Sequence, residues 1–204
     1  MDNQKSLEII SQMIADTSVQ IESNSGKYFL AWGYTTVAVS IFEYFVMGLH
    51  LNPLLIWAWW LIPVIGGVAT LLLARKEAPA PKSYVDRSIS AVWAVFGVSS
   101  LFAFVAAVVY GVSMFYLIVL LMGMGTIITG AICRHRNLII CGSIAMLLSL
   151  VFPIKHIVTK NMDTTAFGEA AEWIIYSDII IFALIFLVMM VIPGHIMCHR
   201  QRRR

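Results

Sequence analysis

The feature that most constrains this chain is a stretch of 46 residues, Ser88 to Cys133, without Asp, Glu, Lys, Arg or His. As one helix it would be about 69 Å long, more than twice the ~30 Å hydrocarbon core of a bilayer. It must therefore cross a membrane twice, and we expect the turn at 110–113. Charged residues make up 12% of the chain, about half the share in soluble domains. This composition excludes a soluble globule, a disordered chain and a nucleic-acid binder.

Apolar stretches separated by polar turns predict an all-α fold, a transmembrane bundle of six helices. We expect a short amphipathic helix over 1–27 to precede them and to end at the polar run Ser23-Asn24-Ser25-Gly26. We expect the polar linker 155–171 to be the longest loop between spans, and residues 195–204 to form a basic tail. The predicted spans are about 28–49, 54–73, 88–109, 114–133, 137–154 and 172–194.

The basic residues predict how the bundle is oriented. With the N-terminus inside, all but two of the 14 Lys and Arg residues lie on inner segments, and only Lys155 and Lys160 lie outside. This is the positive-inside pattern, so we expect both termini in the cytoplasm. The tryptophans at 57, 59 and 60 then fall at the outer end of the second span, where an aromatic belt belongs.

Two acids fall within the predicted spans, Glu43 in the first and Asp178 in the last. A carboxylate in hydrocarbon costs several kcal/mol, so such residues usually face the bundle interior or a cavity. Thr36, Ser40 and Glu43 follow at i, i+4 and i+7, and therefore line one face of the first helix. Because no Lys or Arg falls within a predicted span, we expect both acids to lack a cationic partner.

These residues support two interpretations. In the first, Glu43, Asp178, Ser40 and Thr36 form an intramembrane proton or cation site, with both acids at one depth, where they could meet if their helices are neighbours. In the second, each acid is protonated and hydrogen-bonds a neighbouring helix, which holds the bundle together.

A third group of residues lies near the C-terminus. His195, Cys198 and His199 follow at i, i+3 and i+4, a spacing at which one helix presents ligands to Zn²⁺. The alternative is contact with lipid headgroups and the helix end. The chain has no CxxC and no carboxylate near this trio, so we favour the alternative and expect no metal or cofactor. No GxSxG, HExxH, Walker or Rossmann motif occurs, so we do not expect an enzyme.

The segments 24–36 and 59–67 resemble small bacterial inner-membrane proteins that carry a short polar helix before several spans. The resemblance covers about the first third of the chain. It implies a bacterial cytoplasmic membrane, and it implies neither an activity nor a catalytic residue.

The sequence thus favours a small proton- or cation-linked transport or permeation protein that uses Glu43 and Asp178. The alternative is an accessory, sensing or scaffold subunit without transport of its own, and a membrane enzyme ranks third. The expected contacts are the lipid bilayer and a protein partner or second copy bound through the N-terminal helix. That helix carries an apolar stripe at Leu7, Ile10, Ile14 and Ile21.

Overall fold

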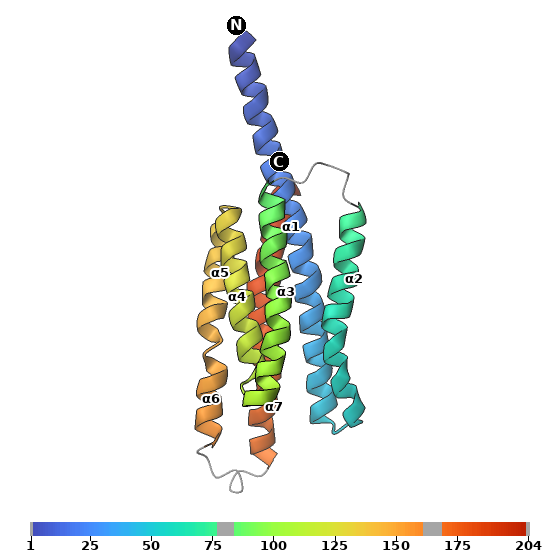
Figure 1. Ribbon diagram of the computed structural model, residues 1–204. Coiled ribbons are helices and arrows are strands. Elements are labelled where there is room, and N and C mark those ends of the chain that lie inside the picture. The colour runs from blue at the N-terminus through green and yellow to red at the C-terminus, as the bar shows by residue number, and fades with distance from the viewer. Residues whose placement is uncertain (1, 77–83, 161–168, 203–204) are drawn as a thin grey trace.

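The computed structural model describes residues 2–76, 84–160 and 169–202, with side chains described over 25–76, 84–159 and 176–199. Within these ranges six helical segments are long and apolar enough to cross a membrane, which confirms a multi-pass all-α fold. Figure 1 shows them side by side in one bundle, with both ends of the chain at the same end of it. The six candidate spans are Ser25–Gly48, Pro53–Lys76, Tyr84–Tyr110, Met114–Ile132, Arg136–Thr159 and Tyr176–His199.

The spans are built from eight α-helices and two segments of other helical type. The 3₁₀ segment η1 opens the second span, and the π-helical segment η3 lies inside the last. In chain order the elements are α1 (Asp2–Gly48), η1 (Pro53–Trp60), α2 (Leu61–Lys76), α3 (Tyr84–Tyr110), α4 (Met114–Ile132), α5 (Arg136–Leu148), α6 (Val151–Lys160), α7 (Glu169–Phe186), η3 (Leu187–Val191) and α8 (Ile192–Arg202).

The first helix departs from the sequence prediction. The predicted stop near Gly26 is wrong, because α1 runs unbroken from Asp2 to Gly48 and its first part projects beyond the bundle (Figure 1). Gly26 instead lets α1 approach α8 closely, since a Cβ there would lie 3.0 Å from Met197 Cβ and 3.2 Å from the Gly194 carbonyl oxygen. The side chains of the predicted N-terminal stripe lie outside the described residues.

The fifth span is longer than predicted. We placed its end at Pro153, but α5 and α6 continue one another through a short break at Ser149 and Leu150, and the span reaches Thr159. Pro153 lies in the first turn of α6, where a missing N–H leaves few helical hydrogen bonds unmade. Lys155, predicted to lie in a loop, is therefore part of a membrane-spanning helix.

The last span also continues beyond its predicted end. Residues 195–202, expected as a tail, are helical and belong to α8, although Pro193 and Gly194 precede them. A Cβ on Gly194 would lie 2.9 Å from Leu30 Cγ, so this glycine is a contact point with α1 rather than a helix stop. The arginine side chains beyond His199 lie outside the described residues.

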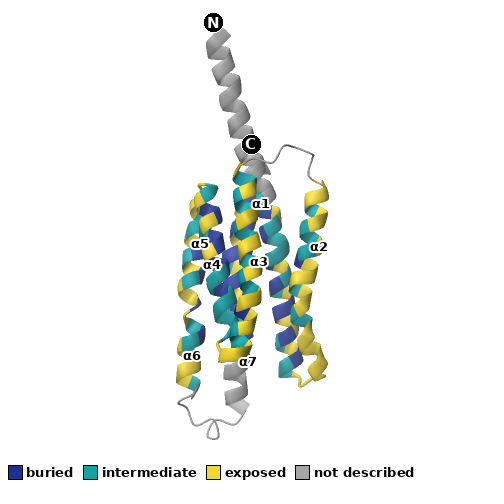
Figure 2. Cartoon of the chain, viewed as in Figure 1, coloured by how far each residue is buried: buried dark blue, intermediate teal, exposed yellow. Residues whose placement is uncertain are grey.

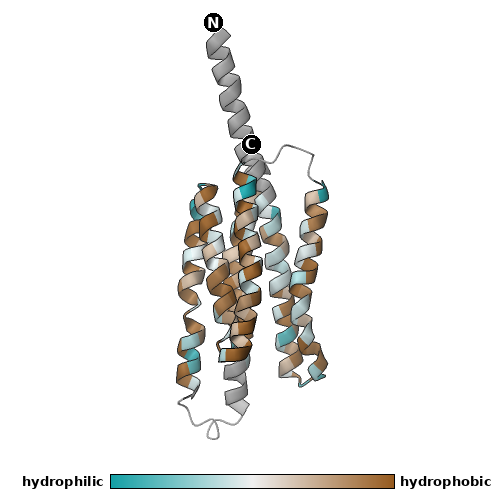
Figure 3. Ribbon diagram, in the orientation of Figure 1, coloured by the Kyte–Doolittle hydropathy of each residue, from teal (hydrophilic) through white to brown (hydrophobic). Residues whose placement is uncertain are grey.

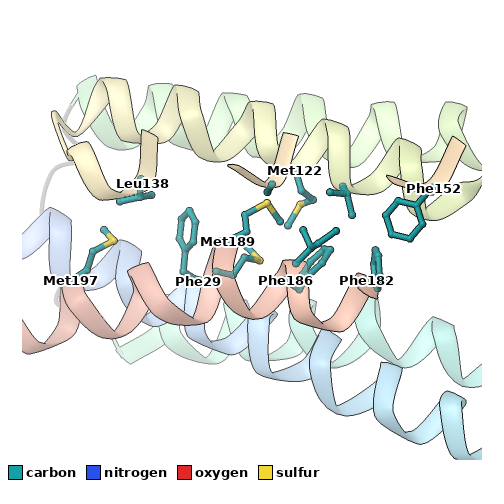
Figure 4. Close-up of a cluster of buried hydrophobic side chains, with 12 residues drawn as sticks. Phe29, Met122, Leu138, Phe152, Phe182, Phe186, Met189 and Met197 are labelled. Carbon is teal, nitrogen blue, oxygen red and sulfur yellow. The ribbon is translucent and has the colours of Figure 1, made fainter. Parts of the chain in front are cut away.

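The hydrophobic core lies between α1, the α4–α6 group and the last span. Figure 4 shows its side chains meeting from these elements, and Figure 2 shows that buried positions concentrate there. At one end Phe115, Phe152 and Phe182 form an aromatic cluster, with centroids 5.8 Å apart for the first two and 5.0 Å apart for Phe115 and Phe182. The labelled core residues are Phe29, Met122, Leu138, Phe152, Phe182, Phe186, Met189 and Met197.

The helices α2 and α3 lie at the periphery. Gly66 is the only buried residue of α2, and Ala103 is the only one of α3. Their exposed positions are largely apolar (Figures 2 and 3), as expected for helices that face lipid. The indole Nε1 of Trp32 donates a 2.9 Å hydrogen bond to Thr70 Oγ1, and its ring covers Gly66, which anchors α2 on α1.

Candidate intramembrane site

The polar stripe of α1 lies in the bundle interior, as its helical spacing predicts. Thr36 is 1% exposed, and Ser40 and Glu43 are 0% exposed. Ser40 Oγ donates a 2.8 Å hydrogen bond to the carbonyl oxygen of Thr36, one turn earlier, so its polar group is satisfied within the helix. Glu43 is thus an acid enclosed completely by the protein.

Unlike the hydroxyl of Ser40, the carboxyl group of Glu43 has no hydrogen-bond partner among the described residues. Neither Oε1 nor Oε2 forms a hydrogen bond in the described part of the chain, and the same holds for Thr36 Oγ1. The backbone of Trp59, in η1, faces the carboxyl group without meeting hydrogen-bond geometry. Leaving a buried polar group unsatisfied costs about 1–3 kcal/mol, and more for a charged group. The buried carboxyl group of Glu43, without a hydrogen-bond partner, therefore lowers the free energy of unfolding.

Two irregular helical segments border this stripe. Trp59 belongs to η1, where the second span is a 3₁₀-helix. On the other side Gly33, one turn before Thr36, packs on η3, since a Cβ on it would lie 2.9 Å from Val191 Cγ2. Both 3₁₀ and π segments shift the backbone hydrogen-bond pattern, and π segments in particular recur at functional sites. The unsatisfied groups of α1 thus lie where the neighbouring backbone is least regular.

Asp178 has different surroundings, and the expectation that it lacks a cationic partner is wrong. Lys155 Nζ lies 2.5 Å from Asp178 Oδ1 and donates a 2.7 Å hydrogen bond to Ser177 Oγ. The ion pair joins α6 to α7 and is partly exposed. The sequence reading missed Lys155 because it ended the fifth span at Pro153. Proline is common in the first turn of a helix, so Pro153 could have been interpreted as a helix start, and Lys155 would then have been predicted to be helical.

The two acids do not share a hydrogen bond, because the Glu43 oxygens accept none within the described residues. Their helices do pack against each other, and both acids lie toward the end of the bundle opposite the termini. Glu43 lies beside η1, whereas Asp178 faces α6. A proton shared directly between the two carboxyl groups is therefore not the arrangement seen, and joint action by the two acids stays a prediction.

The C-terminal trio does not gather as a metal centre. Among the described residues no group of three His, Cys, Asp or Glu side chains could hold a metal ion. His195 Nε2 instead lies 2.6 Å from the hydroxyl of Tyr34 on α1. Cys198 borders the close contact at Gly26, and the side chain of His199 is exposed. The described contacts of His195 and Cys198 join α8 to α1.

Comparison of the chain with protein-family models, with curated proteins and with solved structures found no match.

Proposed function

We propose that the chain is a small proton- or cation-linked membrane transport or permeation protein in which Glu43 is the group that binds the ion. The single observation that carries the proposal is a carboxyl group with 0% exposure and no hydrogen-bond partner for either oxygen in the described residues. Ionisable residues inside a membrane protein are costly, and such positions often serve ion pathways and proton relays.

The surroundings of Glu43 support this role. A neutral carboxyl group tolerates the apolar interior, while the ionised form needs a cation or a donor beside it. The unsatisfied hydroxyl of Thr36 lies on the same helix face as Glu43, two turns or about 10.5 Å away, and continues the polar face beyond the carboxyl group. The irregular segments η1 and η3 are the elements whose rearrangement would bring in water or an ion. The role of Asp178 is secondary, since Lys155 already neutralises it.

The flux test uses the full chain in proteoliposomes under an imposed membrane potential, with a pH-sensitive dye for protons and a cation-sensitive dye for Na⁺ and K⁺. We expect proton or cation flux from the wild-type protein and a loss of about 100-fold or more in Glu43→Gln, which keeps the shape but cannot ionise. Asp86→Asn, at the start of α3, is the matched control and should keep wild-type flux. Flux that persists in Glu43→Gln would overturn the assignment, as would absence of flux for every ion tested.

A second candidate is an accessory, sensing or scaffold subunit, and one observation favours it. The first part of α1 extends beyond the other helices, where it is free of the bundle (Figure 1). A projecting helix of this kind suits a partner protein or a second copy. The two candidates differ in the liposome assay, because an accessory subunit shows no flux alone.

We further propose a bacterial cytoplasmic membrane as the location, with both termini in the cytoplasm. The positive-inside distribution of Lys and Arg together with an even number of spans supports the orientation. The location rests on the resemblance of 24–36 and 59–67 to small bacterial inner-membrane proteins. In a variant without native cysteines, Asn52→Cys should react with an impermeant maleimide added to intact cells. Lys76→Cys, at the other end of the same span, should react only after the cells are opened. The reverse pattern would invert the topology.

A further inference from the structure

A small cavity surrounds the Lys155–Asp178 ion pair. It has a volume of about 130 Å³ and is partly open to the outside of the protein. The side chains of the pair are 17% and 28% exposed. The cavity is large enough for several water molecules, and its polar lining offers the hydrogen-bond partners that they need. The described residues that line it are Ser113, Phe152, Lys155, His156, Thr159 and Asp178.

Two aromatic rings lie on the same side of this ion pair. Phe152 precedes Lys155 by three residues and Phe182 follows Asp178 by four, so each ring lies one turn from the charge, on the same face of its helix. Because α6 and α7 run in opposite directions (Figure 1), both rings lie toward the end of the bundle that holds the termini. They are 1% and 4% exposed and lie next to each other in the core (Figure 4).

The rings continue from the cavity to the surroundings of Glu43. Phe115 contacts both Phe152 and Phe182. The ring of Trp59 lies 5.5 Å from that of Phe115 and 6.0 Å from that of Phe182, centroid to centroid. The backbone of the same Trp59 faces the carboxyl group of Glu43. An aromatic layer, formed by Trp59, Phe115, Phe152 and Phe182, thus lies between the cavity and the buried acid.

We propose that the cavity is the entrance through which the ion reaches Glu43, and that the aromatic layer is the gate that closes this route. The inference rests on the proposed function of Glu43. The route is closed in the structure, since Glu43 is 0% exposed. An apolar constriction excludes ions because it offers nothing to replace their water. Phe115 contacts the other three rings, so its displacement separates the layer and joins the cavity to Glu43.

The test measures how fast a thiol at position 43 reacts, so it does not depend on flux. The full chain without native cysteines carries Glu43→Cys and reacts in micelles with a small cationic methanethiosulfonate. Thiols that remain are counted after denaturation with a heavy maleimide. Adding Phe115→Ala should raise the rate about tenfold or more, because labelling of a buried group follows the population of the open form. An unchanged rate would overturn the gate.

Two controls separate an opened gate from a loosened fold. Phe104→Ala, on α3, removes a ring that lies 6.1 Å from Trp60 outside the aromatic layer, and should leave the rate at position 43 unchanged. Thr129→Cys places the thiol at a position of α4 that is 0% exposed and far along the helix from Phe115. An equal rise there on Phe115→Ala would give the ring a packing role only and overturn the gate.

A more conservative substitution serves if Phe115→Ala does not fold. Phe115→Leu removes the ring but keeps most of its apolar volume, so the fold is expected to tolerate it. It should still raise the labelling rate at position 43, by less than the alanine substitution. Folding is checked by size-exclusion chromatography before labelling. A folded Phe115→Leu variant with an unchanged rate would overturn the gate.

A third substitution tests the entrance itself. Thr159 lines the cavity, so Thr159→Trp fills it with an indole ring. Added to the Phe115→Ala protein, it should return the labelling rate at position 43 to that of the intact layer. The matched control is Val158→Trp, at a neighbouring exposed position that does not line the cavity, and it should leave the rate high. A rate that stays high with Thr159→Trp would place the entrance elsewhere and overturn the proposal.

Labelling and flux fail separately. Flux that requires Glu43, together with an unchanged labelling rate in the Phe115 variants, would overturn the gate and leave the proposed function in place. Raised labelling in a protein without flux would overturn the proposed function and, with it, the role of the cavity as an ion entrance.

Discussion

Replacing Glu43 by leucine is expected to raise the free energy of unfolding by about 1–3 kcal/mol, the cost of an unsatisfied buried polar group. The substitution keeps a similar volume in a fully buried position and removes two oxygens that have no hydrogen-bond partner among the described residues. The measurement is reversible unfolding in mixed micelles, followed by circular dichroism. A stability gain with loss of flux is the pattern expected of a residue retained for function.

The same experiment distinguishes the two interpretations of Glu43. If a protonated Glu43 holds helices together by hydrogen bonding, then Glu43→Leu must lower the stability. Ser40→Ala is the matched control on the same helix face. Among the described residues its hydroxyl bonds only the Thr36 carbonyl, so its loss should change stability by about 1 kcal/mol or less. A destabilised Glu43→Leu beside a near-neutral Ser40→Ala would favour the structural role.

Gly130→Ala is expected to destabilise the protein by about 1–3 kcal/mol, through overpacking between α4 and α5. An added Cβ would lie 2.8 Å from Leu138 Cβ and 2.9 Å from the backbone nitrogen of Ile139. Because the second contact is with backbone, no side-chain rotation relieves it, and the two helices must separate. Unfolding in mixed micelles measures the effect.

Gly97 provides the control for this prediction. It lies inside α3, is exposed, and has no atom within 4 Å of an added Cβ. Gly97→Ala should therefore raise the stability by up to about 1 kcal/mol, since alanine is the better helix former. Equal effects of the two substitutions would show that α4 and α5 do not approach as closely as described.

Much of the candidate site was predictable from sequence, because a helix has a fixed period. The spacing of Thr36, Ser40 and Glu43 predicts a shared face, and the cost of a carboxylate in hydrocarbon predicts that this face turns inward. Whether the Glu43 oxygens find a partner depends on neighbouring spans, which periodicity does not place. The η1 and η3 segments beside the stripe likewise have no sequence signature that we recognised.

What the sequence determined by itself is the class of fold. Long uncharged stretches must form helices in lipid, because only a helix satisfies each backbone group within one segment, and their number follows from length. The tertiary structure decided where helices end and which charges meet. Gly26 and Pro153 are helix breakers by local propensity. Close packing of α1 on α8 makes Gly26 part of a continuous helix, and the restart of the chain at α6 accommodates Pro153 in a first turn. That restart carries Lys155 into the fifth span and onto Asp178, a pairing between residues 23 positions apart that no local pattern encodes.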